Sequence, residues 1–139
     1  MRWPNRRQST QLKRLQPWKD SDMSIDHVLA VVPVSDIQAA QQWYGALMGR
    51  PEDNRPMDTL VEWRVTETAW IQVFHDPDRA GSTLLNLAVD DLEEQAGQLA
   101  ARGVVLDGIE TANKGVRTAS ISDPDGNRIT FIGGFRIVY

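Results

Sequence analysis

The sequence predicts an α+β protein built from two copies of a β-α-β-β-β unit. One helical pattern opens at Val34-Ser35-Asp36-Ile37 and ends at Gly49. A second opens at Val89-Asp90-Asp91-Leu92 and ends at Gly103. Each follows a β-rich run and precedes further strands, and Val34 and Val89 are 55 residues apart. Two such units bury a sheet face that one unit cannot cover alone, and we expect a cavity between them.

The first copy begins with a strand predicted over Ile25 to Val34. Pro33 lacks an N–H donor, which favours a strand end that lies at the edge of its sheet or leaves the sheet. Ser35 is the predicted N-cap of the following helix, and Gly49 is its predicted C′ residue. Residues 50–58 are typical of a loop. The strands predicted after this loop are Thr59 to Val65 and Ala69 to Phe74.

The second copy repeats this order after a connection over residues 76–81. A strand over Thr83 to Val89 leads to a helix with Asp90 as its predicted cap. Asp123-Pro124-Asp125-Gly126-Asn127 predicts a turn, because proline presets φ and glycine accepts positive φ. The other strands predicted for this copy are Val116 to Ser122 and Arg128 to Ile132.

Length and composition limit the protein class. The chain has 139 residues, which predicts one domain, and no apolar run approaches the roughly 18 residues of a membrane span. Cysteine is absent, so disulfides, thiolate zinc sites and cysteine nucleophiles are excluded. Residues 1–22 carry a net charge of +4 and the other 117 residues carry −8. An acidic body argues against a nucleic-acid groove.

The charge asymmetry also suggests a domain boundary. We expect residues 1–22 to form a basic, flexible extension and residues 23–139 to form a single domain. Within that domain we expect one module over about 24–76 and a second over about 82–135. The extension lacks the apolar core of a secretory signal. We therefore expect a cytoplasmic protein without a membrane partner.

The motifs, taken in order, resemble those of the vicinal oxygen chelate superfamily. This superfamily includes glyoxalase I, bleomycin-resistance proteins and extradiol dioxygenases. The resemblance covers residues 24–135 and implies two βαβββ modules whose curved sheets surround a ligand cleft. The residues that carry it are Val34-Ser35-Asp36-Ile37, Trp43-Tyr44, Leu47-Met48-Gly49, Leu87-Ala88-Val89-Asp90-Asp91-Leu92, Leu99-Ala100-Ala101-Arg102-Gly103 and Asp123-Pro124-Asp125-Gly126-Asn127.

The resemblance also implies where a metal ion would bind. Its four ligand positions fall on Leu29, Gln72, Leu84 and Thr130. Leucine has no donor atom, and a neutral amide and a hydroxyl are poor substitutes for imidazole and carboxylate. The two leucines occupy equivalent positions in the two modules. We therefore expect no metal and no cofactor.

Two histidines are the remaining candidates for chemistry. His27 lies two residues before Leu29, on the same face of the predicted strand. It is either a shifted metal ligand, a base near the cleft mouth or a hydrogen-bonded residue at a strand start. His75 lies at a strand end before Asp76-Pro77, which is typical of an exposed turn residue.

Neutral polar and aromatic residues complete the set of expected ligand-binding residues. Gln72, Asn86 and Thr130 provide hydrogen-bonding groups in an otherwise apolar cleft, which suits a polar organic molecule. The alternative is that they satisfy one another or the backbone. Trp63 and Trp70 are placed to stack on a flat ligand or to pack in the core. Trp70 shares a face with Gln72, which favours the cleft.

These observations support three hypotheses. The first is a metal-free binding protein for a small organic ligand of cationic or aromatic character, like the antibiotic-sequestering members of the superfamily. The second is an enzyme that uses His27 with shifted metal ligands, or a metal-independent mechanism. The third is a regulatory or scaffolding module with a vestigial cleft. By resemblance alone we expect a homodimer.

Overall fold

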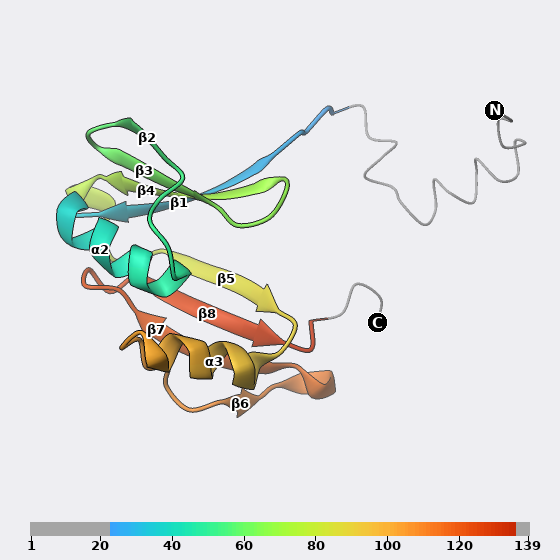
Figure 1. Cartoon of the computed structure of the whole chain (residues 1–139). Coiled ribbons are helices and arrows are strands. Elements are labelled where there is room, and N and C mark those ends of the chain that lie inside the picture. Colours follow the sequence, from blue (N-terminus) through green and yellow to red (C-terminus); the bar gives the residue numbers. More distant parts are fainter. Residues whose placement is uncertain (1–22, 136–139) are drawn as a thin grey trace, which may run out of the picture.

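The computed structural model describes residues 23–135, which form two four-stranded sheets, each with an α-helix against one face (Figure 1). The predicted extension over residues 1–22, and residues 136–139, lie outside the described residues. The elements of the first module are β1 (Val28–Val34), α2 (Ile37–Met48), β2 (Asn54–Met57), β3 (Leu60–Arg64) and β4 (Ala69–His75). A short 3-10 helix, η2 (Pro77–Arg79), leads to the second module. Its elements are β5 (Leu84–Val89), α3 (Leu92–Ala101), β6 (Glu110–Thr111), η3 (Asn113–Gly115), β7 (Arg117–Ser122) and β8 (Arg128–Gly133).

The two sheets have the same topology, which confirms the predicted duplication and the α+β fold class. Their strand orders are β1-β4-β3-β2 and β5-β8-β7-β6. In each sheet the first strand runs parallel to the last, and the other pairs are antiparallel. The sheets do not close into a barrel. β1 lies at an edge, as Pro33 predicted.

The N-cap of each α-helix lies one residue later than predicted. The N-cap of α2 is Asp36, whose carboxylate accepts a hydrogen bond from the backbone nitrogen of Ala39 at 3.1 Å. The N-cap of α3 is Asp91, not Asp90, and it accepts from Glu94 in the same way. The carboxylates of Asp36 and Asp91 each accept a hydrogen bond from the third amide of their helix, and the side chains of Ser35 and Asp90 do not.

Short strands account for the main differences from the prediction. Residues 54–57 form β2 where a loop was expected, and β6 was not predicted. Both are exposed edge strands, held by backbone pairing rather than by an apolar pattern that sequence reveals. β1 begins at Val28, so His27 precedes it.

The core of the first module lies between its sheet and α2. Inward-facing residues alternate along the strands, and Val32, Val61 and Ile71 are almost fully buried. The helix contributes Tyr44 and Leu47 to this core. In Figure 1, α2 lies between the first sheet and strands β5 and β8. The other face of the first sheet, which carries no helix, is therefore turned away from the second module.

The turn over residues 123–127 ties the second module to the first. Asn127 is almost fully buried, and its Nδ2 donates to the carbonyl oxygen of Pro33 at 2.8 Å. Its Oδ1 accepts from the backbone nitrogens of Gly81 and Thr83, each at 3.0 Å. At the other end of α2, Arg102 donates to carbonyl oxygens at the helix C-terminus. These bonds fix the relative positions of the two open sheet faces.

None of the helices within residues 23–135 has the length and apolar character needed to cross a bilayer.

Candidate functional site

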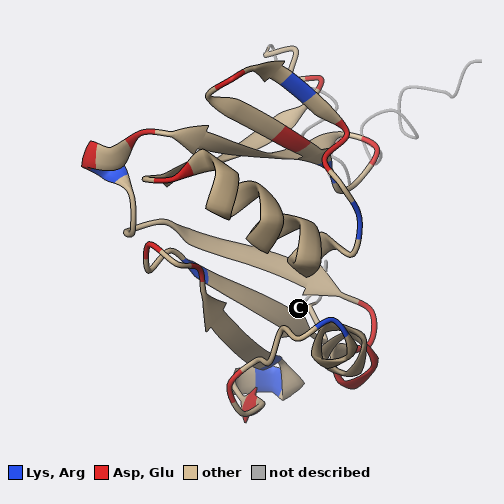
Figure 2. Cartoon of the chain, turned by 60° about the vertical axis from the view of Figure 1, so that its left-hand side comes forward, with Lys and Arg blue, Asp and Glu red and all other residues tan. Residues whose placement is uncertain are grey.

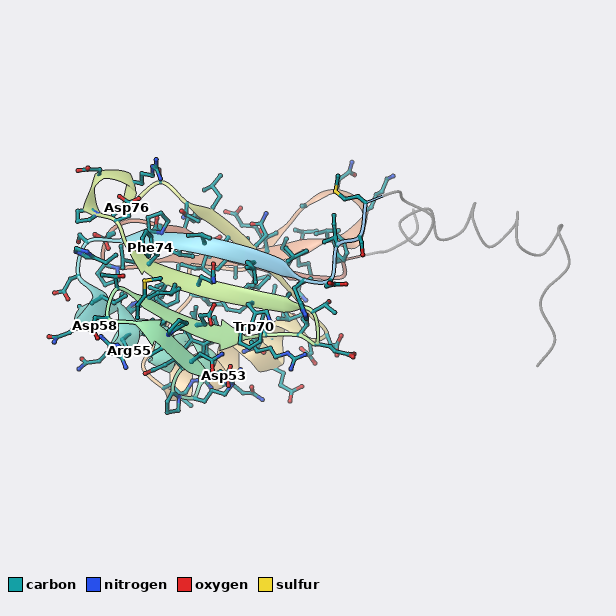
Figure 3. All side chains as sticks on the ribbon, turned by 90° about the horizontal axis from the view of Figure 1, so that it is seen from above. Asp53, Arg55, Asp58, Trp70, Phe74 and Asp76 are labelled. Carbon is teal, nitrogen blue, oxygen red and sulfur yellow. The ribbon has the colours of Figure 1, made fainter. Side chains whose placement is uncertain are left out.

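The open face of the first sheet carries side chains in three rows. Because β4 pairs with both β1 and β3, residues in register across the three strands point to the same side of the sheet. Figure 3 views this face from above and shows Trp70 and Phe74 on β4. The rows, each written from β1 to β3, are Leu29–Trp70–Arg64, Val31–Gln72–Glu62 and Pro33–Phe74–Leu60.

The central row holds the most polar group of this face. Nε2 of Gln72 donates to Oε2 of Glu62 at 2.6 Å, and both side chains are half-buried. Among residues 23–135, no lysine, arginine or histidine forms an ion pair with Glu62. Sequence reasoning missed Glu62. Its signal is the alternation of β3, in which buried Val61 and Trp63 flank an outward-facing carboxylate.

The first row combines an aromatic ring with a guanidinium. The guanidinium carbon of Arg64 lies 5.5 Å from the centroid of the Trp70 ring, within the range of a cation–π contact. The same guanidinium donates to the carbonyl oxygen of Glu67. Arg64 therefore covers part of Trp70 and is held there by the β3–β4 turn.

An ion pair orders the edge of this sheet. Oδ1 of Asp53 accepts from Arg50 at 2.6 Å, and its Oδ2 accepts from the backbone nitrogen of Arg64 at 2.6 Å. These two hydrogen bonds hold the pKa of the Asp53 carboxyl below its usual range, and the bond from Arg50 contributes more than the bond from the Arg64 backbone. This exposed pair positions the end of β3 from which Arg64 projects.

Trp63 does not belong to the open face. Its side chain has no exposed surface, and its Nε1 donates to the carbonyl oxygen of Arg50 at 3.0 Å. It packs against the ring of Tyr44, with 6.3 Å between centroids. Trp63 therefore packs in the core rather than in a ligand site. It directly follows Glu62 along β3, and successive side chains of a strand point to opposite faces of the sheet. Trp70 and Gln72 share the open face, as their spacing predicted.

The open face of the second sheet carries the other predicted residues. Leu84, Asn86 and Thr130 all project from it, and Asn86 and Thr130 are register partners. The hydroxyls of Ser120 and Thr130 lie 2.8 Å apart and form a hydrogen bond. Thr130 therefore satisfies a neighbouring polar group, which is one of the two predicted roles. Its hydroxyl keeps capacity for a further bond.

The two histidines lie apart along the first sheet. His27 is exposed just before β1, and His75 ends β4, where its backbone nitrogen donates to Thr59. In the parallel register of β1 and β4, the partner of His75 is Val34, at the opposite end of β1 from His27. Within the described range, no three histidine or acidic side chains come close enough together to hold a metal ion.

The four positions that the resemblance assigned to a metal do not fit one. Leu29 and Leu84 offer only hydrocarbon, and their side chains are exposed on two different sheets. The amide nitrogen of Gln72 is used by Glu62, and the hydroxyl of Thr130 by Ser120. A divalent ion would gain one amide oxygen and one hydroxyl, which is a poor exchange for its water shell.

The predicted ligand-binding residues thus form two groups rather than one. Leu29, Trp70 and Gln72 lie on the first sheet, and Leu84, Asn86 and Thr130 lie on the second. A hollow of about 520 Å³ does lie between the modules, where the C-terminal end of α2 approaches β5. Only Asn86 of the predicted residues lines it.

The charged residues of the described chain are scattered, with acidic groups at loops and at the start of α3 (Figure 2).

The fold and its motifs define a member of the vicinal oxygen chelate superfamily. The chain belongs to the glyoxalase-like domain family, whose model matches residues 28–132. It is similar to the crystal structure of a glyoxalase/bleomycin resistance protein from Catenulispora acidiphila DSM 44928, with 33% identity and a TM-score of 0.72. That match covers 77% of this chain and 96% of the other.

Two further solved structures are similar to this chain. One is TnmS3, an antibiotic-binding protein from Streptomyces sp. CB03234, with 29% identity, a TM-score of 0.64 and coverage of 80% of this chain and 98% of that one. The other is a bleomycin-binding protein complexed with bleomycin, with 20% identity, a TM-score of 0.64 and coverage of 83% and 100%. This second likeness concerns the fold alone. No curated protein matches the chain significantly in sequence.

Proposed function

We propose that this protein binds a small organic ligand without a metal ion, on the open faces of its two sheets. One observation carries the proposal. Where the superfamily resemblance implies metal ligands, this chain has two leucines, an amide and a hydroxyl, and beside them lie half-buried aromatic side chains and polar groups. The open sheet faces can therefore recognise a polar, flat molecule through ring stacking and a few hydrogen bonds. The antibiotic-binding relative at 29% identity supports a sequestering role.

The proposal includes a homodimer. Leu29 and Leu84 are 51% and 76% exposed, at equivalent positions of the two modules. Exposed leucines on open sheet faces favour a partner surface. A second copy that brings its second module to the first module of this chain would unite the two groups of ligand-binding residues. We also propose that the protein acts in the cytoplasm.

The test of binding uses the full chain and a panel of flat cationic and aromatic antibiotics, bleomycin included. Titration calorimetry measures affinity, and metal content per chain is measured in the same preparation. We expect saturable binding that persists in a chelator, with less than about a tenth of an equivalent of metal, far below the full occupancy of a genuine site. Metal near one equivalent, or binding abolished by the chelator, would overturn the metal-free proposal.

The test of assembly uses light scattering on three variants. Leu29→Glu and Leu84→Glu place a charge on each open face, and we expect both to weaken the dimer and ligand binding together. Val105→Glu is the matched control, because Val105 is exposed outside both faces. A wild-type chain that is monomeric at high concentration would contradict the dimer, while leaving ligand binding on each face to be judged by calorimetry.

A further inference from the structure

We infer that Glu62 and Gln72 form an acceptor pair that selects ligands carrying a protonated nitrogen group, such as an amidinium or guanidinium. This inference rests on the proposed function, since it names the chemistry that the open face of the first sheet would recognise. It assigns a specificity-determining role to Glu62, which no motif of the sequence indicates.

A hydrogen bond joins the two side chains. An ionised carboxylate only accepts hydrogen bonds, so the bond at 2.6 Å requires the amide nitrogen of Gln72 to face Glu62. The amide oxygen of Gln72 then points away from Glu62. Among residues 23–135, no donor bonds to the other carboxylate oxygen, Oε1, of Glu62. The pair therefore offers two acceptor atoms, the amide oxygen of Gln72 and the second carboxylate oxygen of Glu62, to a ligand that carries hydrogen-bond donors.

The charge of Glu62 is also uncompensated. The carboxylate is half-buried, and no cationic side chain of the described chain pairs with it. The nearest cation on this face by register is Arg64, two residues along β3, which is engaged by Trp70 and by the carbonyl oxygen of Glu67. A partly desolvated carboxylate gains more from a ligand cation than an exposed one does.

The rows on either side of the pair set the shape of the ligand. Phe74 and Leu60 lie in the row beyond the pair, roughly 7 Å along the strands, which is the spacing of alternate residues. Trp70 occupies the row on the other side, but Arg64 covers part of it. A flat ring placed over Phe74 can thus direct a short cationic group at the pair. Repulsion from Arg64 favours this orientation over its reverse.

A matched set of three probes tests the inference: naphthalene-2-carboxamidine, naphthalene-2-carboxamide and naphthalene-2-carboxylate. They share one ring system and differ in charge. Titrations are followed by nuclear magnetic resonance of the Trp70 indole N–H and the Gln72 side-chain amide, with the buried Trp63 indole as an internal reference. We expect the amidinium to bind about fivefold more tightly than the neutral amide, and the carboxylate most weakly.

Two variants separate the local charge from the overall charge. Glu62→Gln keeps the size of the side chain and should bring the amidinium and the amide to equal affinity. Glu110→Gln makes the same change of net charge at an exposed residue of the other sheet, and it should keep the preference. Glu62→Ala replaces the glutamine variant should that one not fold.

The outcomes distinguish the inference from the proposed function. Equal binding of all three probes to the wild-type chain, or a preference that survives Glu62→Gln, would overturn the selective role of Glu62 and leave small-molecule binding intact. The absence of any shift on this face with all three probes would overturn both the inference and the proposal that this face binds flat ligands.

Discussion

The hydroxyl of Tyr44 donates a hydrogen bond of 2.8 Å to Oδ2 of Asp123, and both side chains are almost fully buried. Tyr44 belongs to α2 of the first module, and Asp123 begins the turn between β7 and β8 of the second. The same carboxylate oxygen also accepts from Nδ2 of Asn127 at 2.8 Å. A single carboxylate therefore joins the core of one module to the turn of the other.

Replacing Tyr44 with phenylalanine should destabilise the protein without altering its fold. The substitution keeps the ring that packs on Trp63 and removes one donor to a buried carboxylate. We expect a loss of about 1–2 kcal/mol in the free energy of unfolding, measured by urea denaturation. The remaining bond from Asn127 limits the loss. A variant as stable as the wild type would show that this bond contributes nothing net.

Tyr44 should also make the protein sensitive to alkaline pH. Burial, reinforced by the hydrogen bond to Asp123, raises the pKa of Tyr44 well above its ordinary value of 10.0. The folded chain then retains a proton that the unfolded chain releases above pH 10. Stability from this group is full below that pH and falls as the pH rises further. Urea denaturation at pH 9 and 11 should show a smaller decline for Tyr44→Phe than for the wild type; equal declines would contradict the assignment.

Asn127 should tolerate substitution poorly. Its side chain makes four hydrogen bonds, to Pro33, Asp123, Gly81 and Thr83. Asn127→Ala leaves three part-buried backbone groups without these partners, and we expect a loss of about 3 kcal/mol or more. Asn54→Ala, at an exposed position of β2, is the control and should change stability little. Comparable losses for the two variants would contradict the linking role of Asn127.

The two tryptophans of the first sheet should separate stability from binding. Trp63→Ala removes a fully buried ring and should cost about 3–5 kcal/mol in stability. Trp70→Ala alters the open face, so it should cost much less stability. It should also weaken binding of naphthalene-2-carboxamide, because Arg64 does not repel this neutral ligand from the Trp70 ring. Denaturation and titration on both variants measure the two effects. Loss of binding confined to Trp63→Ala would place the ligand elsewhere.

Much of the fold could be predicted because its signals are local. Gly49, with φ of +74°, ends α2 where the helical pattern stopped, and Gly126, with φ of +97°, forms the predicted turn. Period-two alternation placed Trp70 and Gln72 on one face. The same rule, applied along β3, would have placed Trp63 in the core and Glu62 outside it.

The rest depended on contacts between residues far apart in sequence. Asp123 looked like an ordinary turn residue, yet it meets Tyr44 across 79 positions. Ser35 looked like a helix cap, yet its hydroxyl and its backbone nitrogen donate to Asp125 of the other module. The grouping of the site residues on two sheets follows from how the modules pack, which spacing along the chain does not specify.

Gly81 and Gly97 should respond to alanine in opposite directions. At Gly81, φ is +100°, and a Cβ would lie 2.5 Å from the backbone oxygen of Asp125. That oxygen belongs to the turn held by Asn127, so it has little freedom to move. Gly97 lies within α3, is exposed, and has no atom within 4 Å of an added Cβ.

We therefore expect Gly81→Ala to cost about 2 kcal/mol or more, because strain and a backbone clash act together. Gly97→Ala should stabilise the protein by about 0.5–1 kcal/mol, since alanine loses less conformational freedom than glycine when a helix forms. Urea and thermal denaturation of both variants measure the two changes under one set of conditions. Stabilisation by Gly81→Ala would mean that the backbone between the modules can move to accept a side chain. The turn over residues 123–127 would then not be what fixes the relative positions of the two open faces.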